Sequence, residues 1–156
     1  MWPIEPVAYV EAARQQARDD FWGQTLACIR LSEAYTAEAL QGLDAFSHVE
    51  ILFGFHRVDP AHIVTAARHP RNNPDWPAVG IFAQRGKNRP NRLGSTICQI
   101  QRLEGPCLWV AELDAIDGTP VFDIKPVLPA FLPRTPVQQP AWAETLMQAY
   151  WLPEEA

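Results

Sequence analysis

The sequence predicts a mainly β fold, a small antiparallel β-barrel of about six or seven strands with one or two short helices. Short apolar runs rich in β-branched and aromatic residues recur along the chain, separated by glycine, proline and aspartate, a pattern typical of strands joined by turns. The chain has 156 residues, 47% hydrophobic and 20% charged, which suits one folded domain. We expect a single domain over 1–156, with a barrel core at about 7–129 and an extension at 130–156.

Seven runs have the composition of strands. They cover residues 5–10, 24–31, 47–58, 78–84, 95–103, 106–116 and 119–128. Between the second and third runs, SEAYTAEALQGL offers Ser32 as N-cap and Gly42 as a stop, which predicts a short helix over 32–43. QPAWAETLMQAYW predicts a second helix at 139–151. The 15 prolines are spread through the connections, where they stiffen long loops.

Positive charge is concentrated in one segment of an acidic chain. Six of the 13 Lys and Arg residues lie between Arg68 and Arg92 beside a single acid, although the net charge of the whole chain is −5. Such a concentration indicates an anion-binding surface. A solvated loop that is merely basic is the alternative.

Several cofactor and metal motifs fail on spacing. Gly80 and Gly86-Lys87 enclose five residues where a phosphate-binding loop needs four, and Asn88 replaces its Ser or Thr. No G-x-G-x-x-G follows a strand, and neither H-E-x-x-H nor C-x-x-C occurs, so neither a Rossmann cofactor site nor a metal site is expected.

The cysteines and the first residues of the chain indicate in which cellular compartment the protein is expected. Cys28, Cys98 and Cys107 lie within or beside apolar runs and are expected to be free, buried thiols with a structural role. No run is long enough to span a membrane, and the first twenty residues lack the features of a secretory signal. A cytoplasmic location without a membrane partner is therefore expected.

Three ordered motifs, FSHVEILFGFH, GIFAQRGKNRPNRLGS and LDAIDGTPVFDIKPVLP, resemble the TsaA/TrmO-like family. Its members read approximately FSHLWxLFxFH, GVFATRSxxRPNPIGxS and LDxxDGTPVxDIKPYxP, and the similarity covers about residues 7–129. The resemblance implies a barrel that binds S-adenosylmethionine and generally forms a homodimer. It also implies a methyltransferase acting on N6 of threonylcarbamoyladenosine beside the anticodon of tRNA.

The chain departs from the family pattern at several positions. Gln84 replaces a threonine, Arg92 replaces a proline, Val127 replaces an aromatic residue, and RDDFWG stands roughly where the family has a PRQPG-like segment. The residues 86–88, GKN, also differ from the family's serine-containing stretch. These departures leave two alternatives open: a cofactor-binding sensor or adaptor, and a methyltransferase for a different substrate.

Two sets of site residues are expected, the cofactor contacts from the resemblance and the RNA contacts chiefly from the positive charge of a proline-stiffened loop. The cofactor contacts are His56, Arg57, Arg85, Ser95, Leu113, Asp114, Asp20 and Phe21. The RNA contacts are Lys87, Arg89, Asn91, Arg92 and Lys125. No catalytic base is identifiable from the sequence.

The residue types fit these roles. Arg85 directly follows an apolar run, so its guanidinium is expected to hold the cofactor's carboxylate in a bidentate pair. Asp114 is expected to accept from a ribose hydroxyl or an ammonium group. The alternatives are a structural ion pair for Arg85, a structural role for His56, the start of a strand for Ser95, and simple pairing of Lys125 with Asp123.

Overall fold

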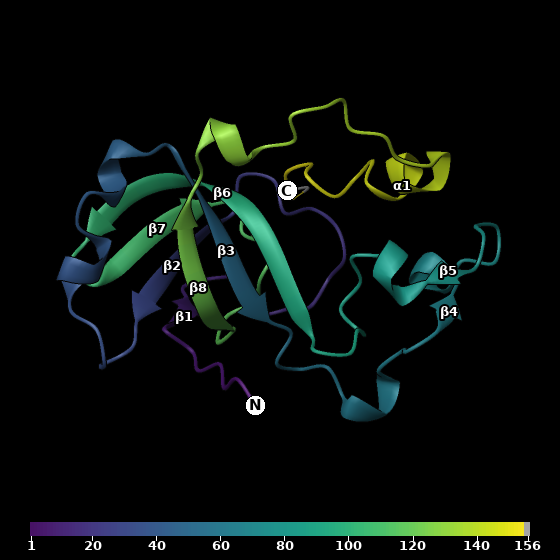
Figure 1. The fold of residues 1–156 in the computed structure, drawn as a ribbon, viewed down its shortest axis with the longest axis horizontal. Coiled ribbons are helices and arrows are strands. Elements are labelled where there is room, and N and C mark those ends of the chain that lie inside the picture. The colour runs from purple at the N-terminus through teal and green to yellow at the C-terminus, as the bar shows by residue number, and fades with distance from the viewer. Residues whose placement is uncertain (155–156) are drawn as a thin grey trace.

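Residues 1–154 are described by a computed structural model, in which six strands form a closed antiparallel barrel. These strands are β1 Ala8–Glu11, β2 Leu26–Leu31, β3 His48–Gly54, β6 Leu93–Glu104, β7 Cys107–Ala111 and β8 Pro120–Pro126. Their order around the barrel is β1-β2-β7-β6-β3-β8, and β1 closes on β8 where Ala8 lies opposite Val121. The barrel occupies the left half of Figure 1. The predicted fold class is confirmed.

The core fills the inside of the barrel because side chains alternate along each strand. In β1, Ala8 and Val10 are buried while the residues between and after them are exposed, as the two-residue period of a strand requires. Phe53 is among the largest buried side chains. A Cβ atom on Gly94 of β6 would lie 2.7 Å from the ring of Phe53, so a glycine is needed here for the ring to fill the core.

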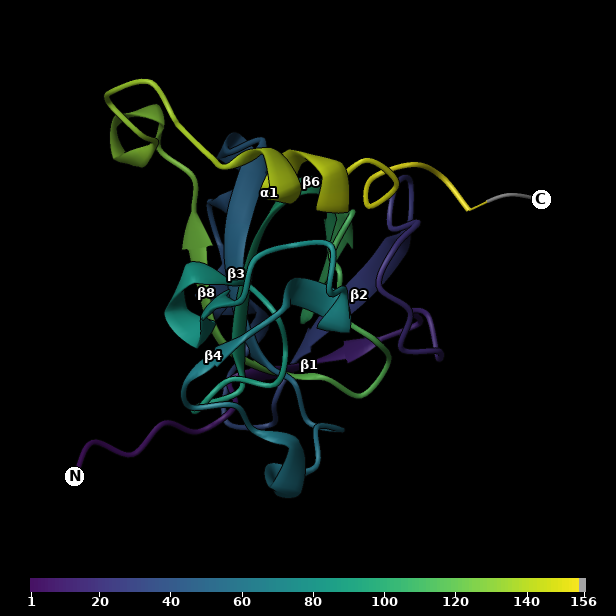
Figure 2. The ribbon, with the colours of Figure 1, turned by 90° about the vertical axis from the view of Figure 1, so that its right-hand side faces the viewer.

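The remaining elements are short and lie outside the barrel. A two-stranded sheet pairs β4 Ala67–Arg68 with β5 Val79–Gly80, and one α-helix, α1 Ala141–Leu146, lies near the C-terminus. Figure 1 shows β4, β5 and α1 to the right of the barrel, and Figure 2 shows the N-terminus on the side opposite to the last described residues. Single turns of 3-10 helix cover Ala37–Leu40, Leu43–Ala45, Pro60–His62, Pro70–Asn72, Ile81–Ala83 and Pro129–Phe131.

The prediction of a barrel strand over 78–84 was wrong. Only Val79 and Gly80 are in strand conformation, and they pair with β4 rather than with the barrel. The chain then turns through Ile81–Ala83, where Ile81 is buried and Phe82 is 79% exposed. The main-chain N–H of Ile81 donates to Ala66 (2.9 Å), so this apolar run folds onto the neighbouring loop.

The helix predicted over 32–43 is replaced by two turns of 3-10 helix. Ser32 does not act as an N-cap, because its N–H donates to the carbonyl oxygen of Val7 (2.9 Å) and so extends the strand pairing. Gly42, at φ 87°, precedes the second turn rather than ending a helix. The C-terminal helix was predicted correctly but is shorter than expected.

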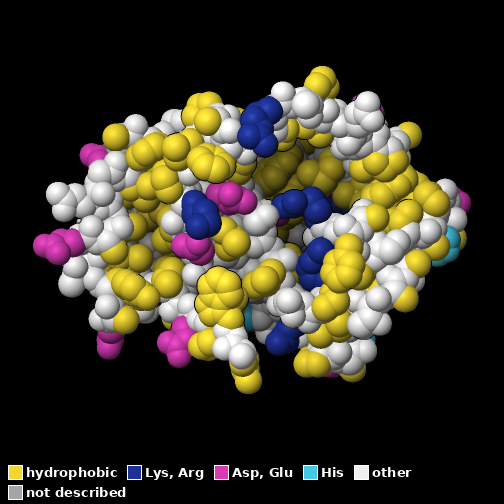
Figure 3. All heavy atoms as spheres, viewed as in Figure 1, with side chains coloured by type: hydrophobic (Ala, Val, Ile, Leu, Met, Phe, Trp, Pro, Cys, Tyr) yellow, Lys and Arg dark blue, Asp and Glu magenta, His cyan; other side chains and the backbone are white. Residues whose placement is uncertain are grey.

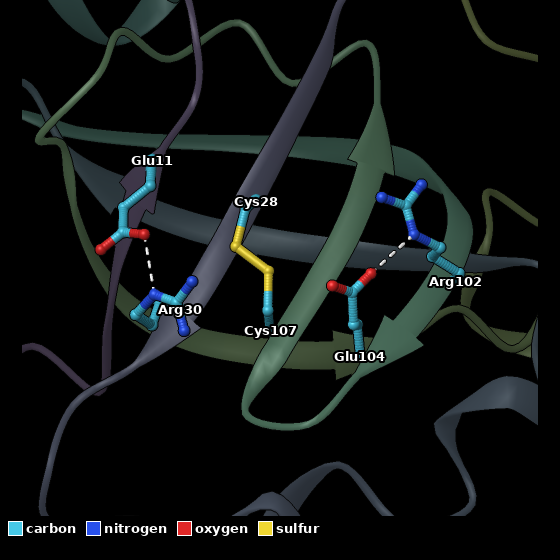
Figure 4. The surroundings of a disulfide bond; sticks show 6 residues. All are labelled: Glu11, Cys28, Arg30, Arg102, Glu104 and Cys107. Carbon is cyan, nitrogen blue, oxygen red and sulfur yellow. Dashed lines mark hydrogen bonds and ion pairs between the residues drawn. A yellow bond between two sulfur atoms is a disulfide. The ribbon is translucent and has the colours of Figure 1, made fainter.

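The cysteine prediction was wrong for two of the three residues. Cys28 on β2 and Cys107 on β7 form a disulfide (Figure 4), and their Cα atoms lie 5.9 Å apart, within the range that such bonds require. They are 79 residues apart in the chain and become neighbours only because β2 pairs with β7. Cys98 is free and buried, as expected.

Candidate functional site

The candidate site lies where β6 begins and β7 has ended. Nη2 of Arg85 donates to the carbonyl oxygen of Ser95 on β6 (2.5 Å) and approaches its hydroxyl (3.4 Å). The structure therefore brings together two of the residues expected to bind the cofactor. Within residues 1–154 Arg85 takes part in no ion pair, so the alternative of a structural ion pair finds no partner there.

Asp114 is held by a hydroxyl group on each side of its carboxylate. Thr96, next to Ser95 on β6, donates to Oδ1, and the phenol of Tyr150 donates to Oδ2. Burial and the neighbouring Asp114 raise the pKa of Tyr150 above its ordinary value, so the phenol stays protonated and donates. Asp114 lies beside β6, and its carboxylate is fixed in orientation.

The RDDFWG segment forms another wall. Arg71 donates to both carboxylate oxygens of Asp20 (2.9 and 3.1 Å), and Arg14 donates to the carbonyl oxygens of Asp20 and Phe21. Phe21 has φ 68°, a left-handed conformation that is uncommon for a bulky residue and concentrates at functional sites. Because Arg71 pairs with the carboxylate of Asp20 and Arg14 binds the carbonyl oxygens of Asp20 and Phe21, the side chain of Phe21 is what these two residues leave for a ligand.

Three guanidiniums of the site, those of Arg14, Arg71 and Arg85, lie close enough to Tyr150 to interact with it electrostatically. The positive charges of Arg71 and Arg85 act on Tyr150 and partly oppose the rise of its pKa, and Tyr150 also acts on Arg14. Burial and the nearby Arg18 lower the pKa of Arg14, whose guanidinium stacks over the ring of Trp22, 3.8 Å from its centroid. Figure 3 shows Lys and Arg side chains gathered around a hollow near the middle of the face that Figure 1 also presents.

His56 and Arg57 follow the end of β3 and are exposed. Arg57 donates to the carbonyl oxygen of Gln15 (3.2 Å), so it reaches the same N-terminal loop as Arg14. The Nε2 atom of His56 faces Gly118 in the DGTP turn, and burial followed by the charge of Arg57 lowers the pKa of His56. The imidazole is therefore favoured in its neutral form near pH 7.

Leu113 differs from the other predicted contacts because its side chain belongs to the core. It is 2% exposed and packs in the main hydrophobic cluster. Only its backbone remains to touch a ligand.

The predicted RNA contacts fall into two groups. Arg89 donates to the carbonyl oxygens of Gln84 (2.7 Å) and Gly86 (3.4 Å), and Arg92 donates to that of Val58 (3.2 Å). Both guanidiniums therefore also shape the loop at residues 84–92, which we call the basic loop. Lys87 is exposed. Asn91 and Arg92 line a groove together with Trp2, Ile4, His56 and Phe122.

Lys125 lies on a different part of the surface. It sits on β8 opposite Glu50 of β3, and its ammonium pairs with Asp123 (2.9 Å). The hydrogen bond and the charge of Asp123 raise the pKa of Lys125. The pairing considered from the sequence is thus present, and the predicted RNA contact would have to compete with it.

Four residues of the site were missed by sequence reasoning: Arg14, Arg71, Thr96 and Tyr150. Arg71 belongs to the basic segment, and its left-handed φ of 52° is shared by Asn72 (56°), a residue type that tolerates this conformation. Tyr150 carries no signal in the sequence, because it lies 36 residues from Asp114. Within residues 1–154 no group of three or more His, Cys, Asp or Glu residues is arranged to hold a metal ion, and no helix there is long and apolar enough to cross a membrane.

Comparison with known proteins finds a family model that matches most of the chain. The model of the "tRNA-methyltransferase O N-terminal domain" matches residues 11–131. A solved structure described as "Crystal structure of TrmO from P. areuginosa" superimposes with a TM-score of 0.72 at 25% identity, covering 91% of this chain and 62% of that one.

Curated relatives carry two kinds of name. A "tRNA (adenine(37)-N6)-methyltransferase" of Rattus norvegicus is 32% identical over 132 residues, which cover 80% of this chain and 30% of the rat protein. A "Probable S-adenosyl-L-methionine-binding protein VirR" of Rhizobium radiobacter is 37% identical over 114 residues, 73% of this chain and 62% of the relative. The chain thus spans about a third of the rat protein's length and under two thirds of the other's.

Proposed function

The chain belongs to the tRNA-methyltransferase O N-terminal domain family, and we propose that it is an S-adenosylmethionine-dependent methyltransferase acting on tRNA. The proposed target is N6 of threonylcarbamoyladenosine beside the anticodon. The single observation that carries the proposal is the position of Arg85, whose guanidinium has no carboxylate partner in residues 1–154. It binds Ser95, and the next residue of the strand, Thr96, holds Asp114.

The residues present fit this cofactor. The guanidinium of Arg85 suits the carboxylate of the methionine part, since a fork of N–H groups can bind both oxygens. Asp114 is an acceptor for a ribose hydroxyl or an ammonium group, and its two hydroxyl partners leave lone pairs on both oxygens. When bound, S-adenosylmethionine would supply the methyl group.

The protein's own contribution to the reaction is chiefly orientation. Holding two reactants in the right orientation can lower the activation free energy of a reaction by about 7 to 11 kcal/mol relative to the bimolecular reaction in solution. Arg85 and Asp114 would fix the position of the ligand by binding two of its polar groups, while the loop from Arg14 to Phe21 would exclude water on one side. We assign no side chain as a base.

The decisive experiment is mass spectrometry of tRNA nucleosides from cells with and without this gene. The proposal requires that the methylated form of threonylcarbamoyladenosine is lost with the gene and restored by its return. An unchanged nucleoside profile would refute this substrate.

A second candidate function is a cofactor-binding sensor or adaptor. The relative named as a probable S-adenosyl-L-methionine-binding protein favours it, as do the altered residues 86–88 of the basic loop. Incubating the purified protein with radiolabelled cofactor and total tRNA separates the two functions. Binding of the cofactor without transfer of label to tRNA would support the sensor.

We further propose that tRNA binds along the basic loop, and that Lys87 contacts a phosphate there. Lys87→Ala is expected to weaken tRNA binding and to reduce the slope of log affinity against log salt by about 0.7 to 0.9, because one fewer phosphate is neutralised. Filter binding over a range of salt concentrations measures this slope.

Two further variants make that measurement specific. Lys125→Ala should change the slope less, because Asp123 already pairs with this cation. Arg92→Ala should lower affinity and also loosen the loop, since its guanidinium holds Val58. If Lys87→Ala keeps the salt slope of the wild type, Lys87 contacts no phosphate, and the proposal that the basic loop binds RNA is refuted.

We also propose a cytoplasmic location, a compartment in which the Cys28–Cys107 disulfide would be unusual. We propose in addition that the protein is a homodimer. Exposed apolar side chains outside the barrel support a further interface, including Phe82 (79% exposed) and Phe131 (87% exposed). Light scattering at micromolar concentration should give twice the mass of the 17.6 kDa chain. A fully active monomer would contradict the dimer.

A further inference from the structure

The C-terminal segment returns to the site after leaving the barrel. We call residues 149–153 the strap. Main-chain N–H groups of Phe21, Trp22 and Gly23 donate to the carbonyl oxygens of residues 149 (3.2 Å), 150 (2.8 Å) and 152 (3.1 Å), and Gly23 forms a parallel bridge with Pro153. All of these strap residues lie beyond the part of the chain that the family model matches, 11–131.

The fit between the strap and the N-terminal segment is tight. A Cβ atom on Gly23 would lie 2.2 Å from the carbonyl oxygen of Trp151, so any larger residue would displace the strap. Arg18 forms an ion pair with Glu154 just beyond it. The strap is thus a specifically docked segment rather than a loose tail.

Docking of the strap delivers one polar side chain to the site. The phenol of Tyr150 donates to Oδ2 of Asp114 while Thr96 holds Oδ1, and the ring of Tyr150 meets that of Trp151 edge-on, with centroids 4.9 Å apart. The phenol is mostly buried among polar groups that include Asp114 and the guanidiniums of Arg71 and Arg85. Its hydroxyl is the contact that fixes Oδ2 of the carboxylate.

We propose that Tyr150 is a positioning residue, supplied by the strap, that orients the Asp114 carboxylate toward the cofactor. The proposal rests on the function proposed above, because it assumes that Asp114 contacts the cofactor. Without the phenol, one oxygen of Asp114 would be free to rotate toward Arg71 or Arg85, and the geometry offered to a ribose hydroxyl or ammonium would no longer be fixed.

A double-mutant cycle tests this role, with calorimetry of S-adenosylmethionine binding as the readout. Tyr150→Phe keeps the ring and removes only the hydroxyl, and should weaken binding about tenfold, equivalent to about 1.4 kcal/mol. In an Asp114→Asn background the same change should alter affinity less than about twofold, because Tyr150 acts through the carboxylate. Thr96→Val, which frees the other oxygen, should also weaken binding.

Tyr35→Phe is the matched control, since Tyr35 is 44% exposed and is distant in sequence from the residues that form these hydrogen bonds. It should leave the affinity unchanged, and thermal unfolding should show that every variant is folded. An equal loss of affinity in both Asp114 backgrounds, or no loss in Tyr150→Phe, would overturn the proposal.

A cofactor-free measurement separates this proposal from the proposed function. Because Tyr150 keeps its proton at alkaline pH, the tyrosinate absorbance step near pH 10 should be equally large in the wild type and in Tyr150→Phe. A smaller step in the variant would mean that the phenol is free, and the proposal would fall. Failure of the wild type to bind S-adenosylmethionine would instead refute the function, while equal steps would still support the sequestered phenol.

Discussion

Arg85→Ala is expected to weaken S-adenosylmethionine binding by about 1.5 to 3 kcal/mol, the range for a lost hydrogen bond to a charged group. This corresponds to about ten- to 150-fold in the dissociation constant. The reason is that Arg85 has no carboxylate partner within residues 1–154, so its interaction with a ligand carboxylate is not replaced. Titration calorimetry of the purified variant measures the effect.

Two control variants test whether the effect depends on the guanidinium group of Arg85. Arg85→Lys keeps the charge but not the bidentate geometry, and should recover only part of the affinity. Arg30→Ala removes a cation that pairs with Glu11 on the barrel wall (2.7 Å) and should leave binding unchanged. A chelator should also have no effect on the wild type. Unchanged affinity in Arg85→Ala would assign this residue to loop structure, through its bond to Ser95.

Gly23→Ala is expected to lower both stability and cofactor affinity, because the new methyl group would overlap the carbonyl oxygen of Trp151. Neither backbone can move away while the strap keeps its hydrogen bonds to Phe21, Trp22 and Gly23. Loss of these three bonds would cost about 3 kcal/mol at about 1 kcal/mol each. Denaturant unfolding and calorimetry measure the two effects.

Gly80→Ala is the matched control, since a Cβ atom at Gly80 would meet nothing within 4 Å. It should change stability by less than about 0.5 kcal/mol, as surface substitutions usually do. If Gly23→Ala were as stable as this control and bound the cofactor equally well, the strap would not be docked as described, and its contribution to the site would be disproved.

The barrel could be predicted from the sequence because its strands carry local signals. In β1 and β2, apolar residues alternate or run together between turn residues, and burial on one face follows from the two-residue period. The run at 78–84 has the same composition but is not in the barrel, because strand pairing depends on which neighbour is available. For Ile81 that neighbour is Ala66, in a loop outside the barrel.

The candidate site, like the barrel, was predictable from the sequence only in part. Arg85, Ser95 and Asp114 lie in motifs of the chain, so the sequence by itself determined which residues to consider, and it determined their chemistry as a cation, a hydroxyl and a carboxylate. Only the tertiary structure decided their partners, because those come from distant segments: Tyr150 for Asp114, and Arg71 for Asp20. The same holds for Cys28 and Cys107, which the pairing of β2 with β7 brings together. The physical reason is that composition and period act over a few residues, whereas a hydrogen bond or disulfide between remote segments exists only after the strands have paired and the strap has docked.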